Sequence, residues 1–181
     1  ELGELVAPHS YRILKKDCLD LPDKVYTKRY VDLTDEQKKA YAQMKENALA
    51  TLNGSSATAF NVLTQLIRLH QITCGHMKTD AEDIIDIKSN RLDELMQILG
   101  ETSGKVIIWA NYIYDIEAIE KAIQKEFGND SYCTYYGATA TEDRQKCINE
   151  FQDPDSPMRF FIGNTQTGGY GITLTAASTV V

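Results

Sequence analysis

A continuous run of apolar residues from Val106 to Ala110 constrains the fold of this chain more than any other feature. A strand that is buried on both faces shows no polar alternation, because each of its side chains meets a layer of helices. Helix-like and strand-like segments then alternate: a helix over 113–127, a strand over 132–136, a helix over 141–151, a strand over 158–162 and an apolar run over 179–181. This alternation predicts parallel strands joined by right-handed crossovers, and so an α/β fold.

The first half of the chain reads as mainly helical. Thr34 and Gln37 have the spacing of a capping box, so we expect a helix to begin there and to carry an apolar stripe as far as Leu52. A second helix is expected to end at Cys74, with Gly75 as its left-handed cap. The residues expected on one apolar face of this second helix are Phe60, Leu63, Ile67 and His70, with Leu66 and Leu69 beside them.

Three further segments complete the first half and its junction with the second. Residues 25–31 alternate apolar and polar side chains, which predicts an edge strand. Residues 76–88 are acidic without clear periodicity, so we interpret them as a linker. Ser89 or Asn90 is expected to cap a helix whose inward residues are Leu92, Leu95, Met96 and Leu99.

The sequence therefore divides into a mainly helical segment over 1–80 and an α/β part over 81–181. The two parts differ in charge. Residues 1–80 carry 11 Lys and Arg against 10 Asp and Glu, whereas residues 81–181 carry 8 against 16. The total of −7 does not indicate a nucleic-acid-binding protein, because such domains usually carry a basic surplus.

Composition excludes several classes of protein. Hydrophobic residues make up 43% and charged residues 25%, which is typical of a globular chain rather than a disordered one. No apolar run is long enough for a membrane span, so we expect no membrane partner. The four cysteines (Cys18, Cys74, Cys133 and Cys147) lack C-x-x-C spacing, which argues against a zinc module and a disulfide scaffold and favours a reducing, cytoplasmic setting.

Chemistry is expected where the parallel strands end, because ligands of open α/β sheets bind beyond the carboxyl ends of the strands. Three segments fall there: 111–112, 137–139 and 164–171. They are rich in small, hydroxyl and amide groups, and backbone N–H groups in such loops can hold phosphate oxygens. Short turns without a ligand would have the same composition, so this pattern leaves both readings open.

Other motifs are weak or absent. The sequence contains no G-x-x-x-x-G-K-[ST] phosphate loop, and Gly168 to Gly171 do not form the dinucleotide fingerprint. Asp93 and Glu94 lie within an expected amphipathic helix, so we interpret them as a solvated face rather than a magnesium site. His70, Cys74 and His76 lack a fourth ligand at suitable spacing, and we expect no metal site. No catalytic set is expected in this chain.

Five segments together resemble the second RecA-like lobe of Swi/Snf-type ATPases in helicase superfamily two. In the lobe these are KVIIWANY (105–112), YYGATATEDRQKCINEF (135–151) and FFIGNTQTGGYGITLTAASTVV (160–181). In the first half, residues 2–44 resemble the segment between lobes, and LTQLIRLHQITCGH (63–76) resembles the helix that follows it. The chain carries no large insertions, so it is most similar to phage and bacterial members.

The resemblance implies a RecA-like parallel sheet with flanking helices, preceded by a mainly helical segment. It also implies roles for individual residues. Those expected to contact the DNA backbone are Asn111, Tyr112, Gly137, Thr139 and Thr165. Those expected at the nucleotide are Gly169, Gly171 and Thr173, although the family usually has Asn at the last position and Ala where Thr167 stands. Arg144 and Phe151 are expected to be structural.

The resemblance further implies the motor lobe of an ATP-dependent DNA helicase or translocase, which uses ATP and Mg²⁺ together with an N-terminal RecA-like lobe of the same parent chain. The phosphate loop and the magnesium-binding acidic pair belong to that first lobe, and the arginine finger is expected beyond Val181. The isolated chain is therefore expected to bind no cofactor alone and to be inactive. The alternatives are a non-catalytic RecA-like module that binds a protein or nucleic-acid partner, and a sugar-nucleotide transferase, which would not share the first half.

Overall fold

The computed structural model describes residues 2–11, 13–14, 20, 23–52, 54–59 and 61–181. The chain divides into two compact units, Glu1–Tyr30 and Val31–Val181. In the described part of the first unit, a short helix α1 (Leu2–Val6) runs into a 3-10 turn η1 (Ala7–His9), and neither buries a side chain. The second unit holds the sheet and the edge at which ligands are expected.

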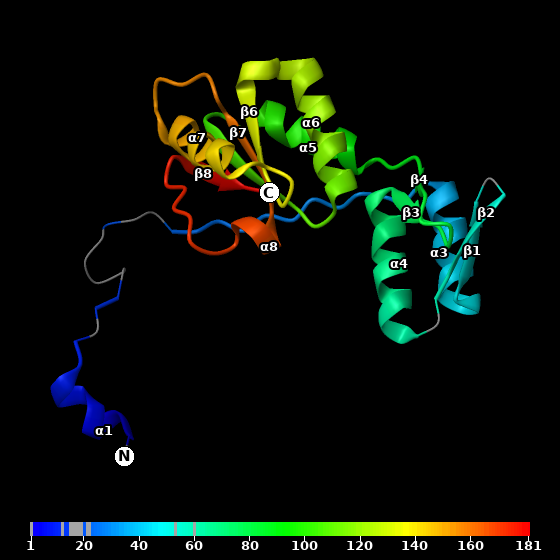
Figure 1. Cartoon of the computed structure of the whole chain (residues 1–181), viewed down its shortest axis with the longest axis horizontal. Coiled ribbons are helices and arrows are strands. Elements are labelled where there is room, and N and C mark those ends of the chain that lie inside the picture. Colours follow the sequence, from blue (N-terminus) through cyan, green and yellow to red (C-terminus); the bar gives the residue numbers. More distant parts are fainter. Residues whose placement is uncertain (1, 12, 15–19, 21–22, 53, 60) are drawn as a thin grey trace. The chain divides into compact units, whose positions relative to one another are not determined.

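A parallel four-stranded sheet forms the centre of the lobe (Figure 1). Its strands, in the order β6-β7-β5-β8, are β6 (Tyr132–Tyr135), β7 (Phe160–Asn164), β5 (Lys105–Ala110) and β8 (Ala177–Val180). Neighbouring strands are parallel throughout, with Ile108 paired to Ile162 at the centre. The predicted parallel α/β sheet with flanking helices is confirmed.

Helices cover both faces of this sheet, as the unbroken apolar run of β5 predicts. Helices α5 (Arg91–Glu101) and α6 (Ile113–Phe127) lie on one face, and α7 (Thr141–Gln152) lies on the other (Figure 1). Alternate residues of β5 supply the two cores: Val106 and Ile108 pack with α5 and α6, whereas Ile107 packs with Phe151 of α7. Phe151 is fully buried, in agreement with its predicted structural role.

The segment before the lobe packs two helices and two hairpins around a core of its own. Helix α3 (Asp35–Asn47) begins with the predicted capping box, because Thr34 Oγ1 accepts from the Gln37 amide and Gln37 Oε1 accepts from the Thr34 amide. It is followed by β1 (Leu49–Leu52), β2 (Ser55–Thr58), α4 (Val62–Cys74), β3 (His76–Lys78) and β4 (Ile84–Asp86). The core residues are Ala40, Met44, Ala50, Ala57, Ile72, Met77 and Ile87.

Several local predictions for this segment are wrong. The first helix ends at Asn47 rather than near Leu52, because Ala48 adopts a left-handed conformation with φ of 51° and the chain turns into the β1–β2 hairpin. Residues 76–88 are not a linker, since β3 and β4 pair there with His76 opposite Asp86. Residues 25–31 form no strand, because no described strand pairs with them and Val25 and Tyr26 stay exposed.

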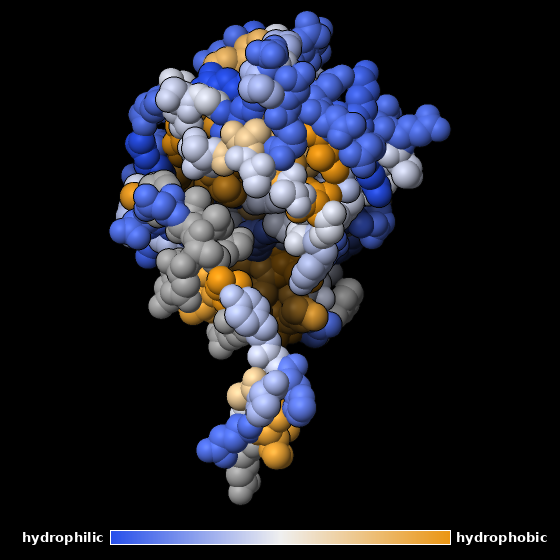
Figure 2. Space-filling model, turned by 90° about the vertical axis from the view of Figure 1, so that its left-hand side faces the viewer, coloured by the Kyte–Doolittle hydropathy of each residue, from blue (hydrophilic) through white to orange (hydrophobic). Residues whose placement is uncertain are grey.

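Helix α4 also differs from the prediction. It ends at Cys74 with Gly75 in the left-handed region, as predicted, but it buries Gln71 and Ile72 rather than the expected apolar stripe. Leu63, Leu66 and Ile67 are exposed by 68%, 58% and 44%. Phe60, expected on the same face, lies outside the described residues. Figure 2 shows the hydropathy of one face of the molecule, on which hydrophobic side chains lie among hydrophilic ones.

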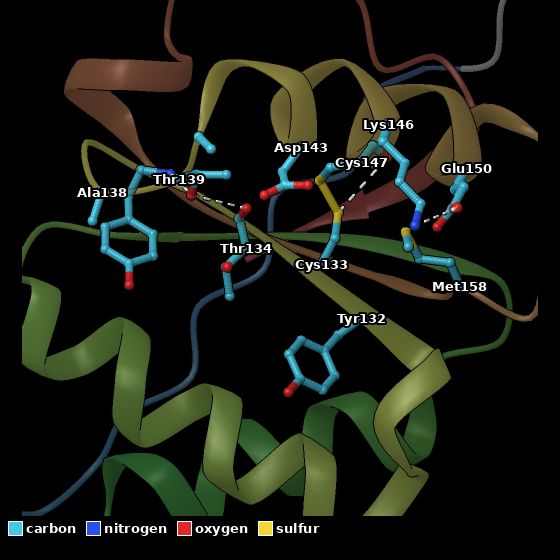
Figure 3. Close-up of a pocket in the computed structure, with 12 residues that line it drawn as sticks. Tyr132, Cys133, Thr134, Ala138, Thr139, Asp143, Lys146, Cys147, Glu150 and Met158 are labelled. Carbon is cyan, nitrogen blue, oxygen red and sulfur yellow. Dashed lines mark hydrogen bonds and ion pairs between the residues drawn. A yellow bond between two sulfur atoms is a disulfide. The ribbon is translucent and has the colours of Figure 1, made fainter.

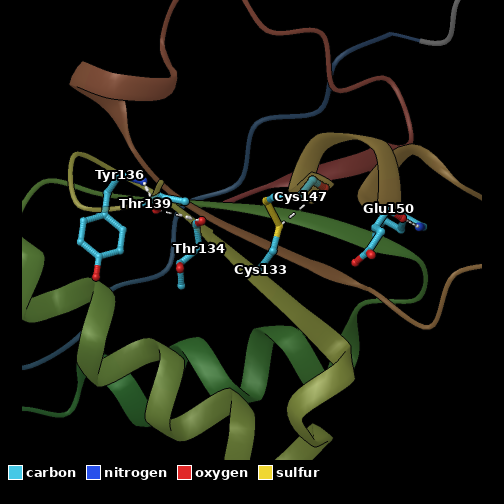
Figure 4. Close-up of a disulfide and its surroundings, with 7 residues drawn as sticks. Cys133, Thr134, Tyr136, Thr139, Cys147 and Glu150 are labelled. Carbon is cyan, nitrogen blue, oxygen red and sulfur yellow. Dashed lines mark hydrogen bonds between the residues drawn. A yellow bond between two sulfur atoms is a disulfide. The ribbon is translucent and has the colours of Figure 1, made fainter. Parts of the chain in front are cut away.

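A disulfide joins Cys133 of β6 to Cys147 of α7 (Figure 4). Their Cα atoms are 5.7 Å apart, within the range that a disulfide spans. The expectation of reduced cysteines is therefore wrong for this pair. Sequence spacing did not reveal it, because the pairing depends on how α7 packs on β6. Cys74 is free, and Cys18 lies outside the described residues.

In the part of the chain that the structure describes, no helix is both long and apolar enough to cross a membrane.

Candidate nucleic-acid and nucleotide interface

Three loops follow the carboxyl ends of β5, β6 and β7, and the parallel order places them at the same edge of the sheet. The first, at Asn111 and Tyr112, leads into α6, and the second, over 136–140, leads into α7. The third leads from Asn164 into the short helix α8 (Thr165–Gly168). The sequence-predicted residues lie in the first two loops, at the start of α8 or after its end.

Asn164 links the first and third loops. Its Nδ2 atom donates to the backbone oxygens of Ala110 and Asn111, at 3.2 and 3.0 Å, while its Oδ1 atom accepts from the Gln166 amide at 2.9 Å. One side chain thus caps α8 and ties the start of α8 to the end of β5. Sequence reasoning did not single out Asn164, because the two carbonyls to which it donates lie more than fifty residues away along the chain.

Thr165 contacts the first loop directly. Its hydroxyl donates to Oδ1 of Asn111 at 3.3 Å, and both residues are exposed. Because Asn164 provides the cap, the hydroxyl of Thr165 is not needed to begin α8. Asn111 and Thr165 therefore place a side-chain amide and a hydroxyl side by side at the surface. The Asn111 Nδ2 group can donate to a phosphate oxygen directly, whereas the Thr165 hydroxyl donates its one hydrogen to Asn111 and would have to turn away from it to donate to a ligand.

The Trp109 ring packs against the third loop, and its position explains why two neighbouring residues are glycine. An added Cβ at Gly163 would lie 2.5 Å from Trp109 Cζ3, and one at Gly168 would lie 2.8 Å from two atoms of the same ring. Both positions are buried, so the indole occupies the space that any larger residue would need. The Trp109 ring therefore sets how closely α8 can approach the sheet.

Internal hydrogen bonds hold the second loop, over 136–140. Thr139 Oγ1 donates to the Thr134 oxygen at 3.2 Å and accepts from the Tyr136 amide at 3.1 Å, so the predicted DNA-contact hydroxyl of Thr139 is engaged within the loop. Arg144 Nη2 donates to the backbone oxygens of Tyr136 and Gly137, both at 3.1 Å. Arg144 is thus structural, as predicted, but it clamps loop carbonyls rather than standing free on the helix surface. Gly137 remains exposed.

A hollow of about 510 Å³ lies beside this loop, between the free edge of β6 and α7 (Figure 3). The disulfide and Thr134 form part of its wall, and charged residues of α7 line it as well. Two of these, Lys146 and Glu150, form a surface ion pair at 3.8 Å. Since it is open and its walls are polar, we assign it no ligand.

The predicted nucleotide residues lie after α8. Gly169, Gly171 and Thr173 are all exposed, and Gly171 has φ of +79°, a conformation that favours glycine. A Cβ at Gly169 would lie 2.4 Å from the Thr165 oxygen, so only glycine allows this turn. The backbone is open to a ligand here, although the side chains supply a single hydroxyl, that of Thr173.

The three residues that could suggest a metal site, His70, Cys74 and His76, each contact other groups of the protein. The His70 ring lies 3.8 Å from Cys74 Sγ and 2.9 Å from the Tyr112 hydroxyl, and Arg91 Nη1 donates to the same sulfur at 2.7 Å. Burial raises the pKa of the Cys74 thiol, with the Arg91 charge acting in the opposite direction. Among the described residues, no group of three or more His, Cys, Asp or Glu is placed to hold a metal ion.

Comparison with known proteins identifies the lobe. Residues 88–181 match the family model of the helicase conserved C-terminal domain. The chain belongs to this family. It is 29% identical to the ISWI chromatin-remodeling complex ATPase ISW1 of Saccharomyces cerevisiae and 27% identical to the putative ATP-dependent helicase/translocase YwqA of Bacillus subtilis, each over all of this chain. These matches confirm the resemblance to Swi/Snf-type second lobes.

Solved structures agree with the helicase C-terminal assignment. The core domain of the Sulfolobus solfataricus SWI2/SNF2 ATPase is 28% identical with a TM-score of 0.66, and the match covers 99% of this chain and 38% of that one. The C-terminal domain of the Sulfolobus enzyme shares the fold with a TM-score of 0.63. The chain spans 17% of ISW1 and 20% of YwqA, so it corresponds to a minor part of these relatives.

Proposed function

We propose that this chain is the C-terminal motor lobe of an ATP-dependent DNA helicase or translocase, to which it contributes contacts to the nucleotide and to the DNA backbone. The observation that carries the proposal is the hydrogen-bonded link between Asn111, Asn164 and Thr165. It joins two loops at the ligand-binding edge of a helicase C-terminal domain. A lobe that only bound a protein partner would not need this exposed polar pair, so the motor is favoured over a non-catalytic module.

In this proposal the backbone-contact residues are Asn111, Tyr112, Gly137, Thr139 and Thr165. Asn111 and Thr165 offer an amide and a hydroxyl, and Gly137 offers an exposed backbone, which can position a strand without reading its bases. Thr139 would act by holding its loop through its internal hydrogen bonds. These groups do not distinguish DNA from RNA, and DNA is proposed from the chromatin-remodelling relatives. Since residues 81–181 carry an excess of acidic residues, we expect binding by the lobe to be weak and to fall steeply with salt.

ATP would contact the open backbone at Gly169 and Gly171 and the hydroxyl of Thr173. This small set of groups fits a supporting role of the lobe in nucleotide binding. The described residues hold no acidic cluster for Mg²⁺, so we assign the metal, and the phosphate loop, to an N-terminal RecA-like lobe of the parent chain. When bound, ATP and Mg²⁺ would supply the phosphoryl group and its charge neutralisation. The compact lobe without large insertions supports a phage or bacterial motor that works in the cytoplasm.

Thr165→Ala tests the backbone assignment in a motor that contains this chain. Because Asn164 caps α8, we expect the melting temperature to stay nearly unchanged. The DNA concentration for half-maximal ATPase stimulation is expected to rise by about three- to tenfold, as the loss of a hydrogen bond to a charged oxygen implies.

Thr167→Ala is the matched control, since it lies on the same short helix and places there the residue that the family usually has. We expect it to leave the DNA dependence of the ATPase unchanged. A lower melting temperature for Thr165→Ala with unchanged DNA dependence would contradict the assignment of Thr165 as a backbone contact.

A further inference from the structure

The segment before the lobe contacts the first candidate loop through two histidines. The His70 Nδ1 atom of α4 lies 2.9 Å from the Tyr112 hydroxyl, and the two rings are 5.4 Å apart. The buried ring of His76 packs edge-on against the same tyrosine, with ring centroids 4.9 Å apart at 78°. Tyr112 therefore contacts two residues of the segment that precedes the sheet.

Neighbouring groups fix the direction of the His70 ring. Its Nε2 atom faces Cys74 Sγ at 3.8 Å, and Arg91 Nη1 donates to that sulfur at 2.7 Å. Both ring nitrogens are satisfied when Nε2 carries the hydrogen toward the sulfur and Nδ1 accepts from Tyr112. Burial raises the pKa of Tyr112, so its hydroxyl keeps the proton that this hydrogen bond needs.

A second tyrosine in the cluster makes a different contact. The Tyr114 hydroxyl donates to Asp86 Oδ1 at 2.5 Å, and its ring lies 4.6 Å from that of His76. Asp115 completes the cluster, with Oδ1 3.4 Å from His76 Nδ1. Tyr114 thus joins α6 to β4 without touching the loop at Asn111, whereas Tyr112 is part of that loop.

On the far side of Tyr112 the contacts continue to the candidate interface. Asn111 is its neighbour in sequence, and the backbone oxygen of Asn111 accepts from Asn164 while its side chain accepts from Thr165. A continuous chain of hydrogen bonds and covalent links therefore runs from His70 on α4 to the exposed polar pair. None of these links to α4 was expected from the sequence, which placed His70 on an apolar face.

We propose that His70 is a positioning residue for the backbone-contact loop: it holds the Tyr112 hydroxyl so that Asn111 stays aligned with Thr165. The expected effect of His70 on DNA binding rests on the proposed function, whereas its expected effect on the loop does not. His70 is exposed, so its removal leaves no buried cavity and should change the stability of the lobe little. Tyr112 then orients the loop in addition to its proposed contact with the strand, beside Asn111 and Thr165.

The test compares His70→Ala, His70→Asn and Tyr112→Phe in a motor that contains this chain, with double-stranded DNA as the probe. For His70→Ala we expect the DNA concentration for half-maximal ATPase stimulation to rise about two- to fivefold, as for the loss of one exposed hydrogen bond, with an unchanged rate at saturating DNA. His70→Asn should restore the wild-type value, because its Oδ1 can accept at the position of Nδ1. Tyr114→Phe is the matched control and should leave the DNA dependence unchanged.

A second measurement, on the 181-residue chain without DNA, separates this inference from the proposed function. His70→Ala and Tyr112→Phe should each increase amide hydrogen exchange at Ile116, whose amide donates to the Tyr112 oxygen, and at Gln166, whose amide donates to Asn164, and the double variant should add nothing further. If these variants speed exchange in the isolated chain but DNA does not stimulate the ATPase of the motor, the proposed function is contradicted and the link between His70 and the loop is supported. Unchanged exchange, additive effects, or equal effects of His70→Ala and His70→Asn would overturn the positioning role.

Discussion

Gly163→Ala is expected to destabilise the 181-residue chain by about 2–3 kcal/mol, in the range found for overpacked cores. Gly163 lies in β7 opposite Trp109 of β5, and the new Cβ would be 2.5 Å from Trp109 Cζ3 and 3.1 Å from the Phe161 ring. Both neighbours are rigid aromatic rings within a packed sheet, so the backbone must move instead. Chemical denaturation of the two proteins measures the loss directly.

Two further variants show whether the clash with Trp109 is the cause. Gly100→Ala makes the same substitution inside α5, where nothing lies within 4 Å of the added Cβ, and should stabilise the chain by about 0.5–1 kcal/mol. Combining Gly163→Ala with Trp109→Leu should cost less than the sum of the single changes, because the leucine removes the obstructing ring atoms. Wild-type stability of Gly163→Ala would show that the sheet does not pack around Trp109 as described.

Reduction of the Cys133–Cys147 disulfide is expected to cost about 3 kcal/mol, as for closing a loop of about 15 residues in the unfolded chain. The bridge spans 14 residues in sequence and encloses the candidate loop over 136–140. We expect the oxidised chain to unfold at a higher denaturant concentration than the reduced chain or the Cys133→Ser/Cys147→Ser variant.

Cys74→Ser controls for general effects of losing a thiol, because Cys74 is not in the disulfide. It should leave the difference between oxidised and reduced protein intact. If oxidised and reduced wild-type chains unfold at the same denaturant concentration, the disulfide does not constrain the lobe.

The sheet could be predicted because its signals are local. The run from Val106 to Ala110 has no polar position, which only a strand covered on both faces tolerates. The capping box at Thr34 and the left-handed Gly75 were also readable, since the backbone groups they satisfy lie within a few residues.

The two hairpins were missed because their strands are only three or four residues long, too short to show a clear period-two pattern. The residues of β1 are mostly apolar and were read as a continuation of the stripe of the preceding helix, whereas β2 has a single apolar residue. The Thr58 amide at the end of β2 is held by Asp80, twenty-two residues away in sequence. The opposite error occurred at 25–31, where apolar and polar residues alternate but no described strand pairs with them. Alternation indicates which face could be buried, whereas a strand needs a partner.

Part of the candidate site was also beyond local reasoning. The three loops were predicted from strand ends and family resemblance, and the structure brings Asn111 and Thr165 into contact. Asn164 was missed because its role depends on hydrogen bonds to the end of β5. Trp109 was read only as part of an apolar strand, yet its ring determines which residues fit at Gly163 and Gly168.

The most direct test of the motor assignment measures ATP hydrolysis by this chain alone and joined to the N-terminal RecA-like lobe of its parent, each with and without DNA. We predict no turnover by the isolated chain, and DNA-stimulated turnover on the order of 10 per second, typical of enzymes, when both lobes are present. Turnover by the isolated chain, or a joined protein that folds but hydrolyses ATP independently of DNA, would contradict the assignment of this lobe to a DNA motor.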